Sequence, residues 1–531
     1  MNFRKSLYQV SLVTIMAISA VNTQAQGVVP AQKGDKTFTL EDLNFGGNNY
    51  RNMVAKNRWC TWWGDQLVRQ DVDACYLVNK TNGKETKLFG INDINQWIAP
   101  TKDVKVRALY NARFPFAGKS IVMVSNGSKT YTVDFRKHRL ISELEFQEGE
   151  DLLEANTQQN AFAYLKGSNL YVRTFNAAPE NTMTKEKKSH DFQLSADGSR
   201  EIVYGQSVHR DEFGISKGTF WSPNGERLAF YRMDQSMVTD YPQVNIPEIG
   251  FDHPETQSCI ATPAPDKYPM TGETSHQVTV GVFDCLTGKT IYLKAGDPTD
   301  RYFTNIAWSP DSKIVYMFEV NRDQNDSRLT AYDAETGEKT GELYRETDEK
   351  YVEPLHPIMF LPWDSNRFIM QSRKDGYNHL YLCTLGKHGS RMASNTESLD
   401  IRQLTSGKWE VMEVLGFNRK RKSIIIASNE CSPIQRNIFL VDTQTGKRTM
   451  MDDCGKGWHN ATLSESGQFV YDNYSTPDVP RKIAIVNTEN GKRTAYFTAE
   501  NPWKGYNVPE YSCGTDSLQF HLMFNNFYGE M

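Results

Sequence analysis

Two short turn patterns recur along this chain, and they constrain its fold more than any other feature. The first has the form Asp/Asn-x-x-Thr/Asn-Gly and occurs at Asp284–Gly288, Asp333–Gly337, Asp442–Gly446 and Asn487–Gly491, with an early relative at Asn79–Gly83. The second has the form Trp/Leu-Ser-x-x-Gly/Ser and occurs at Leu194–Gly198, Trp221–Gly225, Trp308–Ser312 and Leu463–Gly467. Turns closed by glycine between short apolar runs predict β-hairpins.

The spacing of the turns indicates a repeated unit. Gly288 and Gly337 are 49 residues apart, Gly446 and Gly491 are 45 apart, and the 109 residues between Gly337 and Gly446 leave room for two units. A period near 50 with about four strands per unit is typical of a β-propeller blade. We therefore expect an all-β chain, with roughly seven or eight four-stranded antiparallel blades between about residues 38 and 500. Stacked β-sandwich domains are the alternative.

Composition agrees with many short strands and excludes some partners. The 531 residues include 25 Tyr, 27 Phe and 10 Trp, which favour strands, and 36 Gly and 21 Pro, which favour turns. The formal charge is −4 without a long basic block, so nucleic acid is not an expected partner. Helical periodicity is confined to modest candidates at Asn48–Lys56 and Asp151–Ala155.

The N-terminus has the form of a secretory signal peptide over residues 1–25. Arg4 and Lys5 precede the mostly apolar run Leu7–Val21, and small residues follow near Ala25. The apolar run is too short for a membrane anchor, which is the alternative, so we expect export to the periplasm or medium and no integral membrane segment after cleavage. Eight cysteines could form disulfides there, but no spacing matches a metal or redox motif, so no cofactor is expected.

Two segments interrupt the repeat. The proline-rich stretch Tyr241–Pro269 is irregular and too long for a hairpin loop, so we expect it to project from its blade. After about residue 500, the stretch Asn501–Tyr506 has the composition of an exit linker, and 511–531 is apolar and aromatic without a repeat. We thus expect a propeller over residues 26–500 and a different region over 501–531.

An adjacent acidic pair, Asp211–Glu212, precedes one of the tryptophan turns. Two carboxylates side by side suit a cationic group such as a peptide's free amino terminus, to which they would make charge-assisted hydrogen bonds in a partly buried funnel. An ordinary solvated pair beside His209 and Arg210 is the alternative.

Other candidates have plainer interpretations, since Trp221 and Trp308 fit equivalent core positions. The scattered histidines His209, His356, His379 and His459 lack metal spacing.

Several blocks carry a family resemblance. They are Ala161–Tyr171, Val208–Pro242, Asn305–Gly337, Ser372–Leu382, Leu404–Gly416 and Ser432–Phe439. Together they resemble the N-terminal propeller of the dipeptidyl peptidase IV family, within the prolyl oligopeptidase class of serine peptidases, and are most similar to its bacterial secreted branch. The resemblance implies an eight-bladed propeller and peptide substrates with a free N-terminus. It also implies that Asp211 and Glu212 bind the substrate amine, although the family pattern has two glutamates.

The resemblance also raises a question about catalysis. In the family a hydrolase domain follows the propeller and supplies a serine in a G-x-S-x-G elbow. The chain has one formal match, at Gly214–Gly218, without a preceding apolar strand or a following helix pattern. We expect no catalytic residue here, and we expect a truncated product that is inactive alone, because the resemblance fades near Glu510. A stand-alone peptide- or protein-binding propeller is the alternative function, and the oligomeric state stays open, a homodimer included.

Overall fold

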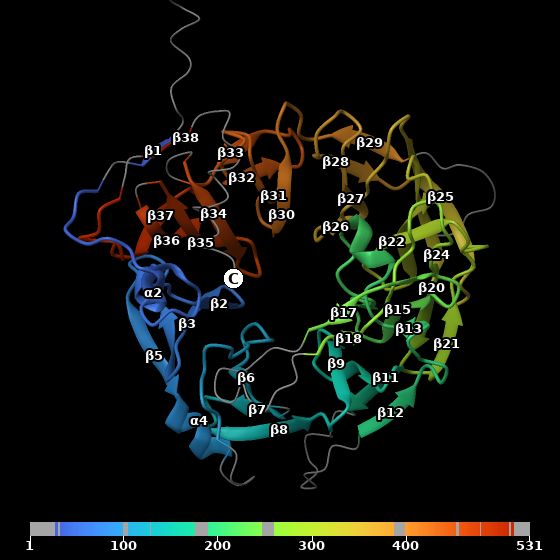
Figure 1. Ribbon diagram of the computed structural model, residues 1–531, viewed down its shortest axis with the longest axis horizontal. Coiled ribbons are helices and arrows are strands. Elements are labelled where there is room, and N and C mark those ends of the chain that lie inside the picture. Colours follow the sequence, from blue (N-terminus) through green and yellow to red (C-terminus); the bar gives the residue numbers. More distant parts are fainter. Residues whose placement is uncertain are drawn as a thin grey trace, which may run out of the picture. The chain divides into compact units, whose positions relative to one another are not determined.

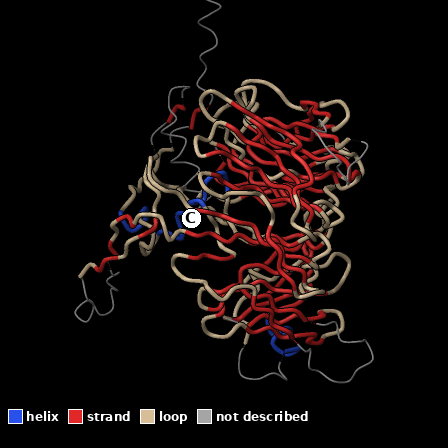
Figure 2. The backbone as a smooth tube through the Cα atoms, turned by 90° about the vertical axis from the view of Figure 1, so that its right-hand side faces the viewer, coloured by secondary structure: helices blue, strands red, loops and turns tan. Residues whose placement is uncertain are grey.

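The structure of this chain is a computed structural model. It describes residues 27–29, 32–98, 105–127, 129–175, 189–246, 260–386, 399–452, 456–477, 479–508 and 511–513. The expected signal peptide at 1–25 and most of the 511–531 stretch lie outside these residues. No helix among the described residues is long and apolar enough to cross a membrane. Strands dominate the chain trace, and the few helices are short (Figure 2).

The chain forms two compact units. The first comprises Met1–Val124, Val133–Leu140 and Trp409–Met531, and the second comprises Ser125–Thr132 and Ile141–Lys408. In the described residues eight antiparallel sheets have three or more strands, and they follow one another in chain order (Figure 1). Six have four strands, one has three and one has five. This series is the architecture of an eight-bladed β-propeller, which confirms the predicted fold class.

The first unit holds the sheets nearest the two chain ends. Its first sheet has strands β2 Cys60–Trp63, β3 Gln66–Gln70, β4 Ala74–Val78 and β5 Glu85–Gly90. Two further sheets consist of β30 Val411–Asn418, β31 Ser423–Ser428, β32 Asn437–Asp442 and β33 Arg448–Met450, and of β34 Trp458–Leu463, β35 Phe469–Thr476, β36 Val479–Asn487 and β37 Arg493–Thr498. The three-stranded sheet β6 Ile121–Asn126, β7 Lys129–Asp134 and β8 Arg139–Glu145 divides between the units.

The remaining elements of the first unit lie near the termini and after β5. Helices α2 Leu40–Leu43, α3 Tyr50–Met53 and α4 Ile91–Ile98 are short, and β1 Gly27–Val29 pairs with β38 Tyr511–Cys513. The backbone N–H of Gln32 also donates to the carbonyl of Val508. The segment after residue 500 is therefore joined to the N-terminal segment through backbone hydrogen bonds.

The second unit holds four complete sheets. The first sheet consists of β9 Glu150–Ala155, β10 Ala161–Lys166, β11 Asn169–Phe175 and β12 Ser189–Gln193, and the second of β13 Ile202–Tyr204, β14 Thr219–Trp221, β15 Arg227–Asp234, β20 Gln277–Asp284 and β21 Lys289–Tyr292. The third sheet consists of β22 Arg301–Trp308, β23 Ile314–Asn321, β24 Asp326–Asp333 and β25 Lys339–Thr347. The fourth sheet consists of β26 Met359–Leu361, β27 Asp364–Ser372, β28 His379–Thr384 and β29 Asp400–Gln403. The helix expected at Asp151–Ala155 is wrong, because these residues form most of β9 and pair with β10.

The recurring turns occupy fixed places in the sheets. All five Asp/Asn-x-x-Thr/Asn-Gly turns join the last two strands of a sheet. At Asp333, for example, one carboxylate oxygen accepts the N–H groups of Glu335 and Thr336, and Gly337 adopts φ +74°. Two of the four Ser turns join the first and second strands of a sheet, Trp221–Gly225 joins β14 and β15, and Leu194–Gly198 lies between two sheets. The turns therefore predicted the hairpins well.

Tryptophan side chains connect consecutive sheets. The indole N–H of Trp308 on β22 donates to the carbonyl of Phe220 on β14 at 3.0 Å, and that of Trp221 donates to the carbonyl of Glu154 on β9 at 3.4 Å. In the first unit the indole N–H of Trp62 donates to Thr462 Oγ1 at 3.1 Å. Both Trp221 and Trp308 pack against buried apolar clusters, as their equivalent turn positions predicted.

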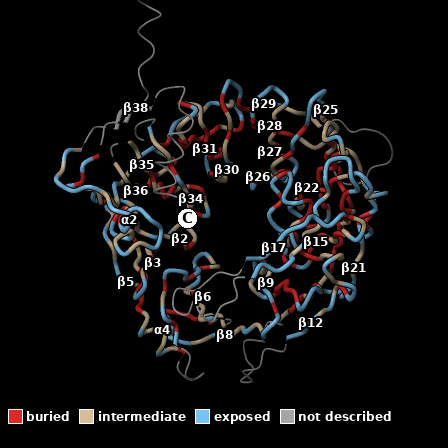
Figure 3. Tube along the Cα trace, in the orientation of Figure 1, coloured by how far each residue is buried: buried red, intermediate tan, exposed pale blue. Residues whose placement is uncertain are grey.

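The first and last sheets pack directly on each other inside the first unit. Leu67 and Val78 share a buried cluster with Tyr471, Ile483 and Ile485. Polar contacts cross the same seam. The hydroxyl of Tyr471 donates to the carbonyl of Arg58, and the hydroxyl of Tyr496 donates to Glu85 Oε1 at 2.6 Å. Burial follows the strands, and exposed residues gather in the turns (Figure 3).

The segment expected to project from its blade forms a two-stranded ribbon. Strands β16 Asp240–Tyr241 and β17 Val244–Asn245 pair with β19 Asp266–Lys267 and β18 Thr262–Pro263. The ribbon lies between β15 and β20 in the chain, and most of its side chains are exposed. We expected irregular chain here from the sequence. The ribbon strands are only two residues long, so they carry no hydrophobic alternation that a sequence pattern could show.

We expect Trp308→Phe to lower stability more than Trp221→Phe does. Both changes remove an indole N–H and the same ring volume, but the hydrogen bond of Trp308 is 0.4 Å shorter by the two distances above. A typical protein hydrogen bond contributes about 1 kcal/mol, and the Phe220 carbonyl would lose this partner. Urea unfolding midpoints of the two variants would measure this difference, and equal midpoints would show that the indole bond to Phe220 contributes no extra stability.

Candidate functional site

The acidic pair lies in a loop that interrupts the first strand of its sheet. Strands β13 and β14 both pair with β15, one after the other along the same edge. The N–H of Gly205 donates to the carbonyl of Tyr231, and the N–H of Tyr231 donates to the carbonyl of Gly218. The chain therefore leaves and rejoins the edge of β15 opposite the same residue, Tyr231. Residues 206–217 form a loop with closely spaced ends.

The neck of this loop requires a glycine. A Cβ atom at Gly218 would lie 2.0 Å from the carbonyl oxygen of Gln206, on the other side of the neck. No side chain can occupy that space without moving the backbone. The Gly214–Gly218 match to a nucleophile elbow thus includes a glycine that closes this loop, and Ser216 lies in exposed chain that leads into strand β14 rather than a helix.

Backbone strain is concentrated at the tip of the loop. The acidic turn, His209–Gly214, contains four non-glycine residues with φ between +53° and +64°, namely His209, Arg210, Asp211 and Phe213. The left-handed conformation costs an L-residue roughly 1–2 kcal/mol. Such a run persists only where the surrounding structure holds it in place, and strained backbone clusters at sites that clamp ligands.

Buried aromatic residues hold the acidic turn on the next sheet. His209 and Phe213 are each 2% exposed, and both rings meet the ring of Tyr302 on β22 edge-to-face, with centroids 4.9 and 5.2 Å apart. The hydroxyl of Tyr302 in turn accepts a hydrogen bond from Arg322 at 2.8 Å. The two buried rings flank the exposed residues 210–212. The turn therefore presents its charged residues while its ends are anchored.

Asn305 adds a polar contact beneath the turn. Strand β22 has a bulge between Thr304 and Ala307, and Asn305 within it has φ +54°. Its side-chain amide donates to the carbonyl of Phe213 at 3.1 Å and to the carbonyl of Pro354 at 2.5 Å. β-Bulges often redirect a side chain beside a functional site. Here the bulge joins the acidic turn to the segment that precedes β26.

The arginine next to the acidic pair is directed away from it. Arg210 forms a salt bridge with Asp266 of the ribbon at 2.5 Å, and its guanidinium lies 4.9 Å from the ring centroid of Tyr268. The nearest cation in the sequence is therefore paired with a different carboxylate. In the alternative interpretation, Arg210 and the acidic pair form an ordinary solvated cluster. The ion pair that Arg210 makes elsewhere counts against this alternative.

The two carboxylates differ in their contacts. Asp211 accepts a short hydrogen bond from the hydroxyl of Ser207, whereas the carboxylate of Glu212 has no hydrogen-bond or ion-pair partner among the described residues. Both side chains belong to exposed residues, so the expected partly buried setting is wrong for the pair. The buried groups here are the flanking rings. The pair itself is exposed because it occupies the outer part of a loop that projects from a strand edge.

His209 is an unusual residue at the base of the turn. Neither of its ring nitrogens has a hydrogen-bond partner among the described residues, and its ring centroid lies 6.2 Å from that of His276. Burial lowers the pKa of His209 to about 3, and the nearby His276 and Arg322 act in the same direction. Burial also lowers the pKa of His276 to about 4. Both rings are thus held neutral at physiological pH.

Two of the other candidate histidines contact neighbouring polar groups. His379 contacts Thr405 Oγ1 and the carbonyl of Gly407, and His459 contacts the carboxylate of Asp472. In the described part of the chain, no three His, Cys, Asp or Glu side chains are placed to hold a metal ion. Four cysteines there are free thiols: Cys60, Cys75, Cys285 and Cys383.

Tyr302 and Asn305 were missed as contributors to this site. Asn305 begins one of the blocks that carries the family resemblance, but no sequence pattern assigned it a role. Its contact with Phe213 joins residues 92 positions apart. A bulge is not visible in the sequence of β22, since apolar residues stand on both sides of Asn305 and no local pattern marks the extra residue.

A family model and curated proteins match most of the chain. Residues 117–481 match the model described as dipeptidyl peptidase IV (DPP IV) N-terminal region. A probable dipeptidyl-aminopeptidase B of Pyrenophora teres f. teres is 26% identical over 84% of this chain and 51% of the relative. Another, of Phaeosphaeria nodorum, is 25% identical over 68% of this chain and 41% of the relative. The chain spans about half the length of these curated relatives.

Solved structures show the same resemblance. A putative dipeptidyl aminopeptidase IV from Bacteroides ovatus matches with a TM-score of 0.77 and 41% identity, over 89% of this chain and 64% of that one. The dipeptidyl peptidase 4 of Porphyromonas gingivalis matches with a TM-score of 0.65 over the same shares of the two chains. At 19% identity the second match supports the fold alone.

We expect His209 to make the protein less stable in acid. Its pKa is lower in the folded state than the ordinary value of 6.5, so the unfolded chain binds the proton first. Stability from this group is complete above pH 6.5 and is lost as the pH falls toward 3. Thermal unfolding between pH 7 and 4.5 should therefore show a smaller loss for His209→Phe than for the wild type. Exposed His190→Phe is the control, and parallel curves for wild type and His209→Phe would contradict the prediction.

We also expect Asn305→Asp and Asn305→Ala to loosen the acidic turn. Either change removes the donor shared by the carbonyls of Phe213 and Pro354, and leaving a buried group without its partner costs about 1–3 kcal/mol. The aspartate keeps the shape of the side chain, so it isolates loss of the donor from loss of volume. Hydrogen exchange of residues 206–217 should accelerate in both variants, and unchanged exchange in Asn305→Asp would rule out this role of the amide.

Proposed function

This chain belongs to the family of the dipeptidyl peptidase IV N-terminal region, and from that premise we propose that it is the substrate-recognition propeller of a serine-type dipeptidyl peptidase. In this proposal the acidic turn binds the free α-amino group of a peptide. The observation that carries it is the carboxylate of Glu212, which is presented by an anchored turn without a partner among the described residues. The proposal also includes export of the protein.

The charges around the turn favour a cationic ligand. Asp211 and Glu212 are adjacent, and the neighbouring Arg210 is paired with Asp266. An ammonium group offers three N–H donors, and hydrogen bonds between ammonium and carboxylate are roughly twice as strong as neutral ones. Glu212 is the principal ligand in this proposal. Asp211 has a shorter side chain, and Ser207 already donates to it.

The anchored backbone of the turn explains how a site of this kind could measure length. The rings of His209 and Phe213 and the amide of Asn305 fix the turn against β22. A fixed amine site places the rest of a bound peptide at a constant distance from it. This suits release of dipeptides from peptide N-termini, and Xaa-Pro and Xaa-Ala peptides are the proposed substrates.

We assign recognition, and not bond cleavage, to the described sheets. Covalent hydrolysis needs a serine activated by an adjacent base. Ser216 is exposed in the loop that carries the acidic turn, and it precedes a strand, so it lacks the elbow context of a nucleophile. In the proposal a hydrolase domain of the family kind supplies the nucleophile.

Calorimetry with a matched ligand pair tests the amine site. We expect Ala-Pro-amide to bind the protein at least about tenfold more tightly than N-acetyl-Ala-Pro-amide, because one charge-assisted hydrogen bond is worth about 1.5–3 kcal/mol. Glu212→Gln should remove most of this preference while leaving the weak binding of the acetylated ligand unchanged. Asp211→Asn should have a smaller effect.

The control variant is Glu335→Gln, which removes an exposed carboxylate from a turn in the same unit. It should bind both ligands as the wild type does. Equal affinities of the wild type for the free and acetylated ligands would refute the amine site. A preference that survives in Glu212→Gln and in Asp211→Asn would place the amine at other residues.

A further inference from the structure

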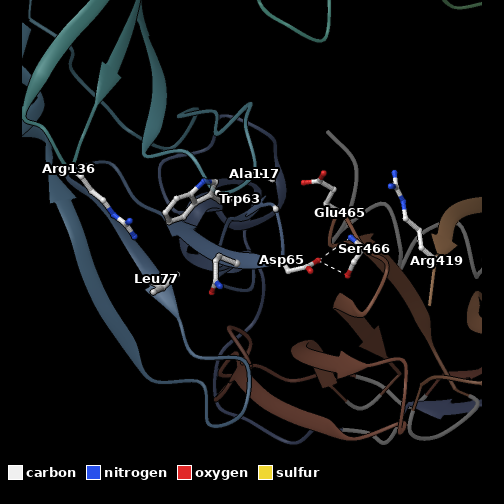
Figure 4. Close-up of a pocket in the computed structure, with 11 residues that line it drawn as sticks. Trp63, Asp65, Leu77, Ala117, Arg136, Arg419, Glu465 and Ser466 are labelled. Atoms are coloured by element: carbon white, nitrogen blue, oxygen red, sulfur yellow. Dashed lines mark hydrogen bonds between the residues drawn. The ribbon is translucent and has the colours of Figure 1, made fainter. Parts of the chain in front are cut away.

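A second candidate site lies in the first unit, at the seam between its first and last sheets. A pocket of about 590 Å³ opens there. Its walls come from the β2–β3 turn, the loop before β6, and the turns β7–β8, β30–β31 and β34–β35. Figure 4 shows Arg136 and Arg419 on opposite sides of this pocket, with Glu465 between them. The acidic turn belongs to the other unit.

The framework of the pocket is fixed by structural contacts. Ser466 donates to Asp65 Oδ1 from its backbone N–H and from its hydroxyl, at 3.1 and 2.8 Å (Figure 4). These hydrogen bonds hold the pKa of Asp65 below its usual value against the opposing effect of burial. The indole N–H of Trp63 donates to the carbonyls of Phe116 and Lys119. Asp65 and Trp63 are therefore engaged in joining the walls.

The charged groups at the mouth of the pocket are not engaged in this way. Among the described residues, neither Arg136 nor Arg419 has a side-chain hydrogen bond or ion pair, and the guanidinium of Arg136 lies over the ring of Trp63, 5.7 Å from its centroid. Each arginine begins a basic turn. These turns contain Arg136, Lys137, His138 and Arg139, and Arg419, Lys420, Arg421 and Lys422, all of which are exposed.

Some of the positive charge in these turns is already compensated, but most of it is not. Lys420 pairs with Glu489 at 2.8 Å, and Arg421 donates to the carbonyls of Thr488 and Glu489. Arg136 and Arg419 at the pocket remain without an ion pair among the described residues, and each has a basic residue next to it in the sequence. A guanidinium binds a carboxylate through two parallel hydrogen bonds, which gives both strength and direction.

We propose that this pocket binds an acidic peptide segment, with carboxylates paired to Arg136 and Arg419. Glu465 would then accept a backbone N–H of the peptide, and the exposed amide of Gln66 could both donate to and accept from the same backbone. The two arginines select for negative charge, while Glu465 and Gln66 suit a ligand that also carries N–H groups. A peptide supplies both features in an extended chain.

The environment of Trp63 favours a peptide over an acidic sugar. Trp63 is 6% exposed, and Arg136 lies over its ring, so no open aromatic face is available on which a sugar ring could stack. A simple inorganic anion would leave Glu465 facing a like charge without a compensating donor. The proposal is independent of the amine site, because the pocket residues all belong to the other unit.

Calorimetry with N-acetyl-triglutamyl amide tests the pocket. The acetyl group removes the free amine, so the probe cannot be bound through the amine site proposed for Asp211 and Glu212. We expect binding by the wild type at low salt, and an at least tenfold loss of affinity in the double variant Arg136→Gln/Arg419→Gln. Affinity should also fall with added salt, because the groups at the pocket mouth are exposed to screening.

The matched control is Arg51→Gln/Arg107→Gln, which removes the same charge from two exposed arginines of the same unit outside the pocket. It should bind the probe as the wild type does. Equal losses of affinity in both double variants would show that the effect comes from net charge alone, and this result would overturn the site. Tighter binding of N-acetyl-trilysyl amide, or of trigalacturonate, than of the triglutamyl probe would overturn the assignment to an acidic peptide, as would failure of the wild type to bind the triglutamyl probe.

Discussion

Contact between successive sheets is the constraint on which the rest of this structure depends. A single sheet of this size cannot bury both of its faces, so each sheet must pack against the sheets beside it. The indole N–H groups of Trp308 and Trp221 give this packing a direction, because each donates to a carbonyl of the preceding sheet, on β14 and on β9 respectively. In the first unit Trp62 makes the comparable bond to Thr462, between the first and last sheets.

The acidic turn shows how this packing supports a strained site. Residues with left-handed backbone conformation would cost several kcal/mol in an isolated peptide. The neighbouring sheet offsets that cost through Tyr302 and through the amide of Asn305. The candidate site therefore depends on two sheets, since one contributes the loop and the next contributes the anchor. The same relation holds for the pocket in the first unit, whose walls come from turns of several sheets.

The hairpins and their order could be predicted from the sequence because their determinants are local. In the turn at Asp333, a carboxylate, two N–H groups and a glycine within five residues fix the geometry. The helix predicted at Asp151–Ala155 failed for the opposite reason. Those residues have a weak local preference, and pairing with β10 makes them a strand. The acidic pair could be named from its motif, but its exposure could not.

By itself the sequence determined the repeated sheet, the places of most turns and the identity of the acidic pair, because each depends on residues that are neighbours in the chain. Only the tertiary structure decided what surrounds that pair. It brings Asp266 to Arg210 across 56 positions and Asn305 to Phe213 across 92, and it assembles Arg136, Arg419 and Glu465 around one pocket. Contacts over such separations depend on how whole sheets pack, and no short stretch of sequence encodes that.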